Sequence, residues 1–386
     1  MSEKKALLVC NAYPSENNIY KNGFIHRRVK LYLKNNLDIV VFCVNNKFTN
    51  LIYDNYDGVT VIRGNKTDYE SFLKENDFHS YLIHFISKDK YDPIIETKVN
   101  PKIIIWIHGS EVEAWHRRWF DFLTSREALK RTLYYTIKYY PERIEFLNNL
   151  YSQETYDVTF IYVSRWFKEN VADVDARTSP KKYEIIPNVV DGELFNYLEK
   201  DKNKRKKILS IRPFANMKYS NDLTVEAILE LSTKDYFYDL EFSIYGDGKY
   251  FDSVLEPIRK FENVNIHKGF LKQDEISALH KEYGVFICPT RWDSQGVSMC
   301  EAMSSGLVPI STNITAIPEF VKHNKTGLLA LPESGKSLAR QVEKLYFDEN
   351  LFLNISREAA KGIREIAGQD KVISKELDVI LGEQFD

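Results

Sequence analysis

The sequence predicts an α/β protein in which two doubly wound parallel sheets form separate domains. Short, almost continuously apolar runs alternate with helical patterns along the chain, as expected for buried parallel strands joined by crossover helices. The alternation is interrupted between residues 186 and 207 by a Pro-Asn turn and then by a Lys/Asp-rich stretch, which indicates a linker. A length of 386 residues suits two domains of ordinary size.

The first domain is expected over residues 1–190, with helical patterns such as Phe24–Tyr32 between several of its strands. Its apolar runs predict strands at Ala6–Cys10, Ile39–Cys43, Val59–Ile62, Tyr81–Ile86, Ile103–Ile107 and Val158–Val163.

The second domain is expected over residues 191–369. Its strands are predicted at Ile208–Ile211, Leu240–Tyr245, Val264–His267, Val285–Cys288, Val308–Ser311 and Gly327–Leu329. Its helices are predicted at Asp222–Leu231, Glu275–Tyr283 and Ser337–Leu345. Two such sheets joined by a linker predict a ligand cleft between them, because ligands bind at the carboxyl ends of parallel strands.

Composition indicates a soluble globular protein, with 44% apolar and 28% charged residues. A net charge of −2 argues against nucleic-acid binding. The four cysteines include no C-x-x-C pair, which suits a reducing compartment. No apolar run has the length of a signal peptide or a membrane span, so a cytoplasmic protein is expected. The eight histidines show no ligand spacing, so we expect neither a metal nor a cofactor.

Residues 289–309 hold the most informative pattern. Asp293 and Glu301 lie eight positions apart, a turn containing Gly296 follows Asp293, and a helix is expected to start near Ser298. A strand, a glycine-containing loop and a helix N-terminus form a natural phosphate site, because unpaired amides point outward at the helix start. We therefore expect ligand contacts along this turn and the start of the helix, from Gly296, Val297, Ser298 and Met299.

Two cations, Arg212 and Lys218, follow the strand that opens the second domain. In a loop before a helix they can clamp a diphosphate, Arg as a bidentate fork and Lys as a point charge. The alternative is two solvated loop cations. Gly246 and Gly248 end the next strand, where they would let the chain approach a ligand. The alternative is that Tyr245-Gly-Asp-Gly248 forms an ordinary tight turn.

His108 follows the strand Ile103–Ile107. A single histidine after a strand is often structural. However, residues at the carboxyl ends of strands in open α/β sheets face the ligand crevice, which favours a functional role here.

These motifs resemble those of the family 4 retaining glycosyltransferases, which have the GT-B fold. Asp293 to Glu301 is similar to their Glu-x7-Glu signature, with Asp in place of the first Glu. Arg212 and Lys218 resemble their Gly-Arg-x4-Lys-Gly motif, without its glycines and with five residues between the cations. The segment Ile186–Phe195 is similar to their interdomain link. The resemblance covers most of the chain and implies two Rossmann-like domains facing a cleft, with a C-terminal helix in residues 370–386 that returns to the first domain.

The resemblance implies a hexosyltransferase that moves a sugar from UDP or GDP to a hydroxyl of a glycan or lipid-linked glycan, as in surface polysaccharide assembly. Configuration would be retained and no metal needed. Arg212 and Lys218 would stabilise the leaving diphosphate, Glu301 would hold the ribose hydroxyls, and Asp293 would hold the donor sugar. His108 would contact that sugar near its 6-hydroxyl.

Two further assignments come from the resemblance. Phe270 lies in the segment His267–Phe270, which is similar to the one that meets the nucleobase. Gly23 ends the polar loop Asn11–Gly23, which is similar to the acceptor-side loop of the family.

Residues 115–151 are rich in aromatic and basic side chains. Leu129, Leu133, Ile137 and Tyr140 form a helical stripe, which predicts a core-packing helix with a charged outer face. The alternative is contact with an anionic membrane surface at the inner face of the membrane, because aromatic and basic side chains favour that interface. Asp173-Val-Asp175 matches an Asp-x-Asp metal motif, but its position after a helical pattern predicts a solvent-exposed loop.

Two other functions remain open. A sugar-nucleotide epimerase of the same fold would release nucleotide and sugar without an acceptor. A nucleotide-binding module or NAD-dependent oxidoreductase would carry G-x-G-x-x-G after its first strand, and Cys10-Asn-Ala-Tyr-Pro-Ser has no such glycines.

Overall fold

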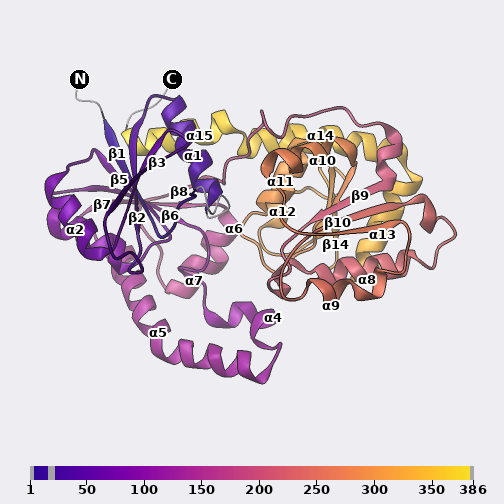
Figure 1. Cartoon of the computed structure of the whole chain (residues 1–386), viewed down its shortest axis with the longest axis horizontal. Coiled ribbons are helices and arrows are strands. Elements are labelled where there is room, and N and C mark those ends of the chain that lie inside the picture. Colours follow the sequence, from indigo (N-terminus) through magenta and orange to yellow (C-terminus); the bar gives the residue numbers. More distant parts are fainter. Residues whose placement is uncertain (1–3, 16–21, 383–386) are drawn as a thin grey trace. The chain divides into compact units, whose positions relative to one another are not determined.

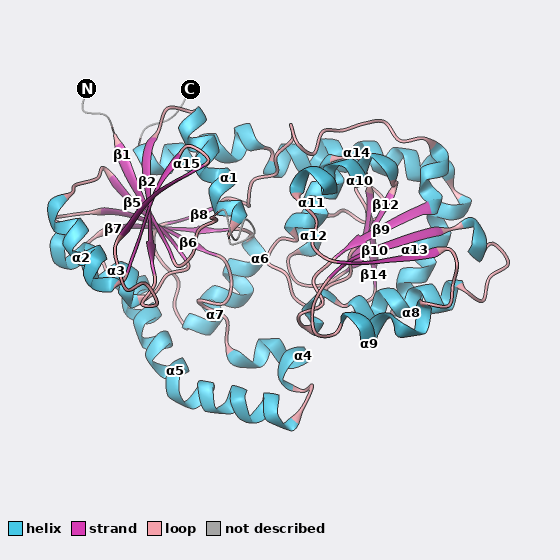
Figure 2. Ribbon diagram, in the orientation of Figure 1, coloured by secondary structure: helices cyan, strands magenta, loops and turns pink. Residues whose placement is uncertain are grey.

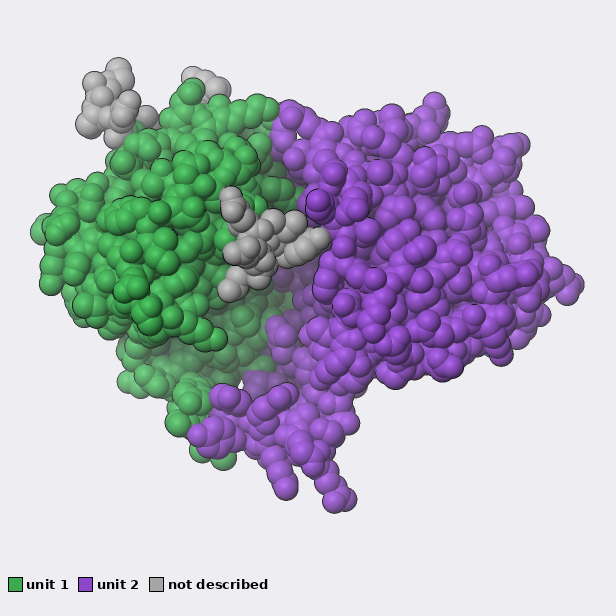
Figure 3. All heavy atoms as spheres, viewed as in Figure 1, with its two compact units in different colours: residues 1–114, 136–189, 370–386 green, residues 115–135, 190–369 purple. Residues whose placement is uncertain are grey.

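The computed structural model describes residues 4–15 and 22–382. The chain forms two compact units, coloured green and purple in Figure 3: unit 1 comprises residues 1–114, 136–189 and 370–386, and unit 2 comprises residues 115–135 and 190–369. The sequence analysis places residues 115–135 in the first domain, and the structure corrects this. That segment groups with unit 2 because α4 (Trp119–Phe122) packs against the short 3₁₀ turn η4 (Met217–Tyr219).

The described residues of unit 1 form an eight-stranded sheet in the order β3-β4-β2-β1-β5-β6-β7-β8. All neighbours pair in parallel except β3, which runs antiparallel to β4. The strands are β1 (Lys5–Cys10), β2 (Asp38–Val44), β3 (Ile52–Tyr56), β4 (Val59–Gly64), β5 (Ser80–His84), β6 (Lys102–Ile107), β7 (Asp157–Tyr162) and β8 (Tyr183–Ile185).

Helices cover both faces of this sheet (Figures 1 and 2). They are α1 (Gly23–Lys34), α2 (Lys66–Glu75), α3 (Lys88–Thr97), the C-terminal end of α5 (Arg126–Ser152), α6 (Arg165–Phe167), the π-helical turn η2 (Lys168–Ala172), α7 (Asp173–Ala176) and α15 (Gln369–Leu381). Helix α1 buries Ile25, Arg28, Val29 and Tyr32, which share one face of the helix at spacings of three and four residues.

Unit 2 contains a six-stranded, fully parallel sheet in the order β11-β10-β9-β12-β13-β14. Its strands are β9 (Lys207–Ile211), β10 (Glu241–Gly246), β11 (Val264–Lys268), β12 (Val285–Ile287), β13 (Val308–Thr312) and β14 (Leu328–Ala330). Besides α4, its helices are α8 (Asn221–Leu231), α9 (Phe251–Leu255), α10 (Gln273–Glu282), α11 (Val297–Ser304), α12 (Ile317–Phe320), α13 (Gly335–Phe347) and α14 (Glu349–Ala367). Short 3₁₀ turns are η1 (Trp115–Arg118), η3 (Lys202–Lys206), η5 (Phe237–Asp239) and η6 (Glu256–Ile258).

The apolar runs of the sequence correspond to strands of these two sheets, so the predicted fold class is confirmed. The sequence analysis missed β3 and β8. Strand β3 is almost entirely exposed and so lacks an apolar pattern, and β8 has three residues.

Helix α15 is attached to unit 1 by a buried carboxylate. Glu376 accepts hydrogen bonds at 3.0 Å from Arg28 Nε, at 2.7 Å from the Tyr32 hydroxyl and at 3.1 Å from Trp106 Nε1. Val372, Ile373, Leu377 and Ile380 of the same helix join the apolar core formed by β1, β2 and α1. The charge of Glu376 is thereby balanced by a fully buried arginine.

We expect Glu376→Ala to destabilise unit 1 by about 3–5 kcal/mol, because the buried Arg28 would lose its counter-ion. Chemical unfolding, followed by the tryptophan fluorescence of the chain, measures this loss. The double variant Arg28→Met/Glu376→Leu is the control, because removing both charges together costs far less. Equal losses in the two variants would contradict the role of the ion pair.

Candidate functional site

The sequence-predicted residues of unit 2 lie in loops that follow four of its strands. Arg212 and Lys218 follow β9, Gly246 and Gly248 lie at the end of β10, and Phe270 follows β11. Asp293 follows β12 and leads into α11. Because these strands are parallel, the loops emerge at the same edge of the sheet, where α/β proteins bind ligands.

Arg212 is buried, with 5% of its surface exposed, and carries no counter-ion among the described residues. Its Nη1 donates to the Ser298 hydroxyl at 2.8 Å, so residues 86 positions apart meet here. Its guanidinium lies 4.7 Å from the centre of the Tyr219 ring. Its Nε is buried without an acceptor in the described part of the chain. An unpartnered donor on a buried cation is costly in the free protein and favours an anionic ligand.

The N-terminus of α11 is open to an acceptor. The helix begins at Val297, after Gly296, which has a left-handed φ of 82° and provides no side-chain cap. The amides of Val297, Ser298 and Met299 have no acceptor within residues 4–15 and 22–382. The helix N-terminus therefore adds partial positive charge beside Arg212, a combination suited to phosphate oxygens.

The two carboxylates of the motif differ in their surroundings. Asp293 Oδ1 accepts from the Gln295 and Gly296 amides at 3.2 and 2.8 Å, which closes the turn before α11. Its Oδ2 is not hydrogen-bonded to any described residue. Glu301 is buried in the second turn of α11, which begins at Val297, one residue before the expected start near Ser298.

Lys218 is held through its backbone. Its carbonyl accepts from the Arg291 amide at 2.8 Å and from the Thr290 hydroxyl at 3.1 Å. The Arg291 guanidinium binds Asp222 through two hydrogen bonds of 2.8 and 2.7 Å and also pairs with Glu333. Sequence reasoning missed Arg291 as a positioning residue, although it lies inside the 289–309 segment.

Gly246 and Gly248 are needed by the chain itself. A Cβ on Gly246 would lie 2.0 Å from the Arg212 carbonyl oxygen, and one on Gly248 would lie 2.3 Å from the Phe214 carbonyl carbon. The two glycines thus let the loop after β10 pack against the loop that carries Arg212. The space beside their α-carbons is filled by backbone, which differs from the close ligand approach expected from the sequence.

Phe270 is 60% exposed and lies two residues beyond β11. The adjoining Gly269 amide donates to the Gly246 carbonyl at 2.9 Å, which joins this loop to the glycine loop. On the neighbouring strands β10 and β11, the Tyr245 and His267 rings stack with centroids 4.3 Å apart.

His108 and Gly23 belong to unit 1. His108 follows β6, and its Nε2 lies 2.8 Å from Nδ1 of His84, a second histidine that sequence reasoning missed. Burial lowers the pKa of His108 to about 3. Gly23 is the first residue of α1, and no atom lies within 4 Å of the place its Cβ would take. Residues 16–21 of its loop lie outside the described residues.

Two sequence interpretations of residues 115–176 are wrong. The predicted core stripe of α5 is not in a core: Leu133 and Ile137 are 41% and 78% exposed, and Leu129 and Tyr140 are half-buried. The buried residues of α5, Leu147, Leu150 and Tyr151, lie near its C-terminal end. Asp173 and Asp175 lie in a short helix and not in a solvent loop. Asp173 pairs with Lys168 at 2.7 Å, and the buried Asp175 accepts from the Ala114 amide.

Within the described ranges, no three His, Cys, Asp or Glu side chains gather as a metal-ligand set. In the same part of the chain, no helix combines the length and apolarity needed to cross a membrane.

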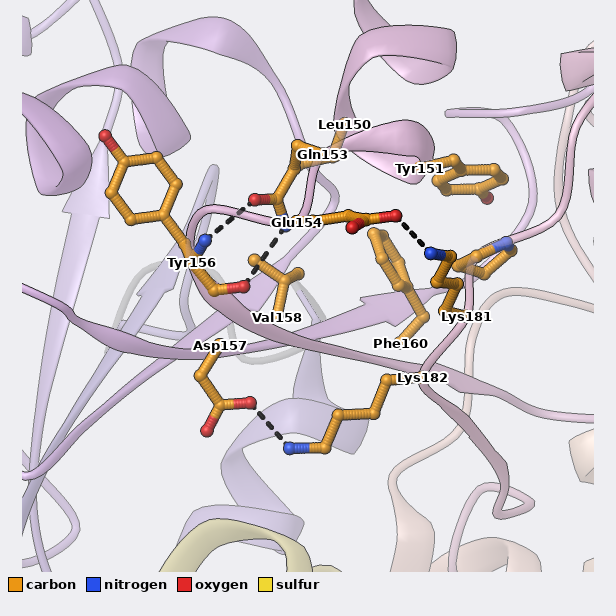
Figure 4. Close-up of a pocket in the computed structure, with 11 residues that line it drawn as sticks. Leu150, Tyr151, Gln153, Glu154, Tyr156, Asp157, Val158, Phe160, Lys181 and Lys182 are labelled. Atoms are coloured by element: carbon orange, nitrogen blue, oxygen red, sulfur yellow. Dashed lines mark hydrogen bonds and ion pairs between the residues drawn. The ribbon is translucent and has the colours of Figure 1, made fainter.

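Figure 4 shows a pocket of about 230 Å³ in unit 1, lined by α5, β7 and the segment before β8. Its charged side chains pair with one another, Glu154 with Lys181 and Asp157 with Lys182. Since these charges are already balanced, the pocket lacks the uncompensated positive charge found beside α11.

We expect Gly248→Ala to destabilise unit 2 by at least about 2 kcal/mol, because its Cβ would overlap the backbone at Phe214. Thermal unfolding measures the change. The matched control is Gly23→Ala, which places a methyl group in open space at a helix start and should change stability by less than about 1 kcal/mol. A Gly248→Ala protein as stable as the control would show that the two loops are not packed as described.

Known proteins match this chain in sequence and in fold. Residues 196–362 match the family model described as glycosyl transferases group 1. N-acetyl-alpha-D-glucosaminyl L-malate synthase of Bacillus anthracis is 26% identical over 208 residues, which cover 50% of this chain and 52% of the relative. The UDP-Gal:alpha-D-GlcNAc-diphosphoundecaprenol alpha-1,3-galactosyltransferase of Escherichia coli is 23% identical, over 53% of this chain and 56% of that protein. The chain thus matches about half the length of these relatives.

Among solved structures, Anabaena HepE in complex with UDP and glucose superposes with a TM-score of 0.69 and 11% identity, over 98% of this chain and 100% of HepE. The likeness extends over both units, whereas the family model covers most of unit 2. Residues 196–362 of unit 2 therefore match a glycosyl transferases group 1 domain, and the two units have the GT-B fold.

Proposed function

We propose that this protein transfers a sugar from UDP or GDP to a hydroxyl group of a glycan or lipid-linked glycan, with retention of configuration. One observation carries the proposal: a buried arginine without a counter-ion lies against a helix N-terminus that has three free amides. In a glycosyl transferases group 1 domain, a nucleoside diphosphate is the ligand that such a site fits best.

The donor diphosphate would lie between Arg212 and the start of α11. Arg212 Nε and the amides of Val297, Ser298 and Met299 are donors without partners among the described residues. Lys218 would add a second full charge from the 3₁₀ turn after β9. Charge develops on the diphosphate as the glycosidic bond breaks, so donors fixed in advance lower the barrier to that step.

The carboxylates would orient the sugars of the donor. Glu301, one turn further along α11, would accept hydrogen bonds from the ribose hydroxyls. Asp293 keeps Oδ2 for a hydroxyl of the transferred sugar, while its Oδ1 holds the turn. His108 of unit 1 would bind the 6-hydroxyl of the transferred sugar, and Gly23 would lie on the acceptor side. The exposed Phe270 ring would contact the base.

The chemical step can proceed without a metal. The acceptor hydroxyl attacks the anomeric carbon from the face that the diphosphate leaves, and the bond from that carbon to the phosphate oxygen breaks. The proton of the acceptor hydroxyl passes to the departing phosphate oxygen. The two full charges of Arg212 and Lys218 would offset the charge of the leaving group, which is the role a divalent cation plays elsewhere.

The acceptor side favours a lipid-linked glycan at an anionic membrane, as in surface polysaccharide assembly. Residues 115–140 contain six Lys and Arg against two acidic residues, although the whole chain has a net charge of −2. We define the α5 surface as the exposed Leu133, Tyr134, Tyr135, Ile137 and Tyr139 with the neighbouring Lys130, Arg131 and Lys138. Aromatic and apolar side chains between cations suit the interface of an anionic bilayer. The E. coli relative, by its name, acts on a diphosphoundecaprenol-linked sugar.

Removing the proposed diphosphate donors should abolish donor turnover. We expect Arg212→Ala and Lys218→Ala each to lower the rate of UDP-sugar or GDP-sugar hydrolysis by about a hundredfold or more, because each removes a charge opposite the leaving group. The control is Arg259→Ala, which deletes a surface arginine paired with Asp252.

Near-normal rates in both site variants would refute the diphosphate site. Thermal shifts with UDP, GDP and NAD test the nucleotide class, and stabilisation by NAD alone would overturn the proposal. Product analysis separates transfer from epimerisation, since an epimerase would release free sugar and nucleotide in the presence of any acceptor.

Charge reversal on the α5 surface should prevent membrane binding. We expect the intact chain to sediment with vesicles that contain phosphatidylglycerol and not with phosphatidylcholine alone. Lys130→Glu/Arg131→Glu/Lys138→Glu should weaken binding at least tenfold, because each cation near an anionic surface contributes about 1 kcal/mol. The matched triple Lys322→Glu/Lys325→Glu/Lys361→Glu changes a lysine cluster of unit 2 and should bind as the natural protein does. Equal loss in both triples would point to net charge and contradict a specific surface.

A further inference from the structure

An aromatic ring lies against the two cations that follow β9. The guanidinium carbon of Arg212 lies 4.7 Å from the centre of the Tyr219 ring, and Lys218 Nζ lies 5.3 Å from the same centre. Both distances are within the range over which the face of an aromatic ring attracts a cation. Lys218 directly precedes Tyr219, so its contact follows from the chain. The contact with Arg212, seven positions away, requires the loop to fold back.

The loop is folded back by its own side chains. The Asn221 side-chain amide donates to the Pro213 carbonyl at 2.9 Å, which closes the loop. The Asn216 side chain accepts from the amide two residues later at 3.1 Å and so starts the 3₁₀ turn η4. Helix α4 packs against this turn, and Tyr219 is half-buried. The ring therefore has a fixed place beside Arg212.

Asp293 is the acceptor that would compete for Arg212. Its Oδ1 accepts from the amides of the turn before α11, and its Oδ2 is not hydrogen-bonded to any described residue. Burial raises the pKa of the Cys288 thiol to about 12, the Arg212 charge lowers it and the Asp293 charge raises it. Both side chains thus lie close to the same thiol, and yet Arg212 donates to the Ser298 hydroxyl and not to the carboxylate.

A ring and a carboxylate act differently on Arg212. A carboxylate would take up its donors and cancel its charge, which would leave a diphosphate little to bind. The face of the Tyr219 ring attracts the cation through its quadrupole and offers no lone pair. Arg212 Nε accordingly stays without an acceptor in the described part of the chain. The ring thus holds the guanidinium and leaves its charge in place.

We propose that Tyr219 is a positioning residue that holds Arg212 away from Asp293 in the free protein, so that the guanidinium remains open to the diphosphate of the donor. This role rests on the proposed function, because it concerns the same diphosphate site. The motif that Arg212 and Lys218 resemble has a glycine at the position of Tyr219, so the ring is a feature of this chain. Without the ring, Arg212 would be paired with Asp293 for part of the time, and the paired fraction would lower the apparent affinity for a diphosphate.

Titration calorimetry of the full chain with UDP and GDP tests this role. We expect Tyr219→Leu to bind the diphosphate about fivefold more weakly, because one contact between a cation and a ring is lost. Tyr219→Phe should stay within about twofold, because the ring is kept. Uridine and guanosine, which lack phosphate, should bind all three proteins equally. The control is Tyr238→Leu, which removes a tyrosine of unit 2 that is 63% exposed and should leave diphosphate binding unchanged.

Second substitutions show whether Tyr219 acts through Arg212. In an Arg212→Ala background, Tyr219→Leu should have no further effect on diphosphate affinity, because its target is absent. Asp293→Asn removes the competing charge and keeps an acceptor for the turn before α11. Adding Tyr219→Leu to that variant should therefore weaken diphosphate binding by less than about twofold. A purely structural role of Tyr219 would give the same loss in all three backgrounds.

Unchanged diphosphate affinity in Tyr219→Leu would overturn the proposal, and so would a loss that persists in Arg212→Ala. If Tyr219→Leu does not fold, forms of Tyr219→Phe with one, two or three ring fluorines replace it, because fluorine withdraws charge from the ring face at nearly constant size. Diphosphate affinity should then fall with each added fluorine, and a constant affinity would overturn the proposal.

Nitrogen NMR of the full chain, labelled with ¹⁵N at arginine, examines the contact without any ligand. The Nε–H signal of Arg212 is the one lost in Arg212→Ala. We expect Tyr219→Leu to shift this signal and Tyr219→Phe to leave it in place, because only the leucine variant removes the ring current. A signal unchanged in Tyr219→Leu would contradict the contact. A natural protein that bound neither UDP nor GDP would refute the proposed function, whereas this signal would still show whether the ring holds Arg212.

Discussion

Uncompensated positive charge beside the start of α11 is the physical feature that defines the candidate site of unit 2. Three of the buried arginines illustrate the point. Arg28 is balanced by Glu376, and Arg291 is balanced by Asp222 and Glu333. Arg212 has a serine hydroxyl and an aromatic ring as its neighbours, and no described carboxylate pairs with it. A folded protein tolerates such a charge where a ligand supplies the missing anion.

The surrounding backbone keeps this charge in place. Asp293 closes the turn before α11 with one oxygen, so the first amides of the helix stay unpaired. Gly246 allows the loop after β10 to pack against the Arg212 carbonyl, and this contact fixes the backbone of the arginine. Arg291 holds the backbone at Lys218. Each of these contacts orients donors without neutralising them, which is the arrangement that catalysis of phosphate departure requires.

Sequence patterns identified the fold because buried parallel strands must be apolar along their whole length. The same rule explains the misses, since β3 is exposed and β8 is too short to form a pattern. The apolar stripe of α5 led to a wrong prediction of core packing, for the opposite reason. Its helical spacing is real, but spacing does not say whether a partner surface covers it, and Ile137 remains exposed.

Site residues with a local signature could be named from sequence, and those defined by distant partners could not. Arg212 and Asp293 lie in recognisable motifs. His84 becomes significant only through His108 on the neighbouring strand, and Arg291 only through Asp222 and Glu333. The burial of Asp175 likewise depends on the backbone at Ala114.

Titration calorimetry can compare how tightly the protein binds a nucleoside and the corresponding nucleoside diphosphate, and so tests the diphosphate site. If Arg212 and the α11 amides bind the diphosphate, UDP or GDP should bind at least about a hundredfold tighter than uridine or guanosine, a difference of about 2.7 kcal/mol. That difference should nearly vanish in Arg212→Ala. Equal affinities for nucleoside and diphosphate in the natural protein would contradict a diphosphate site at Arg212 and α11.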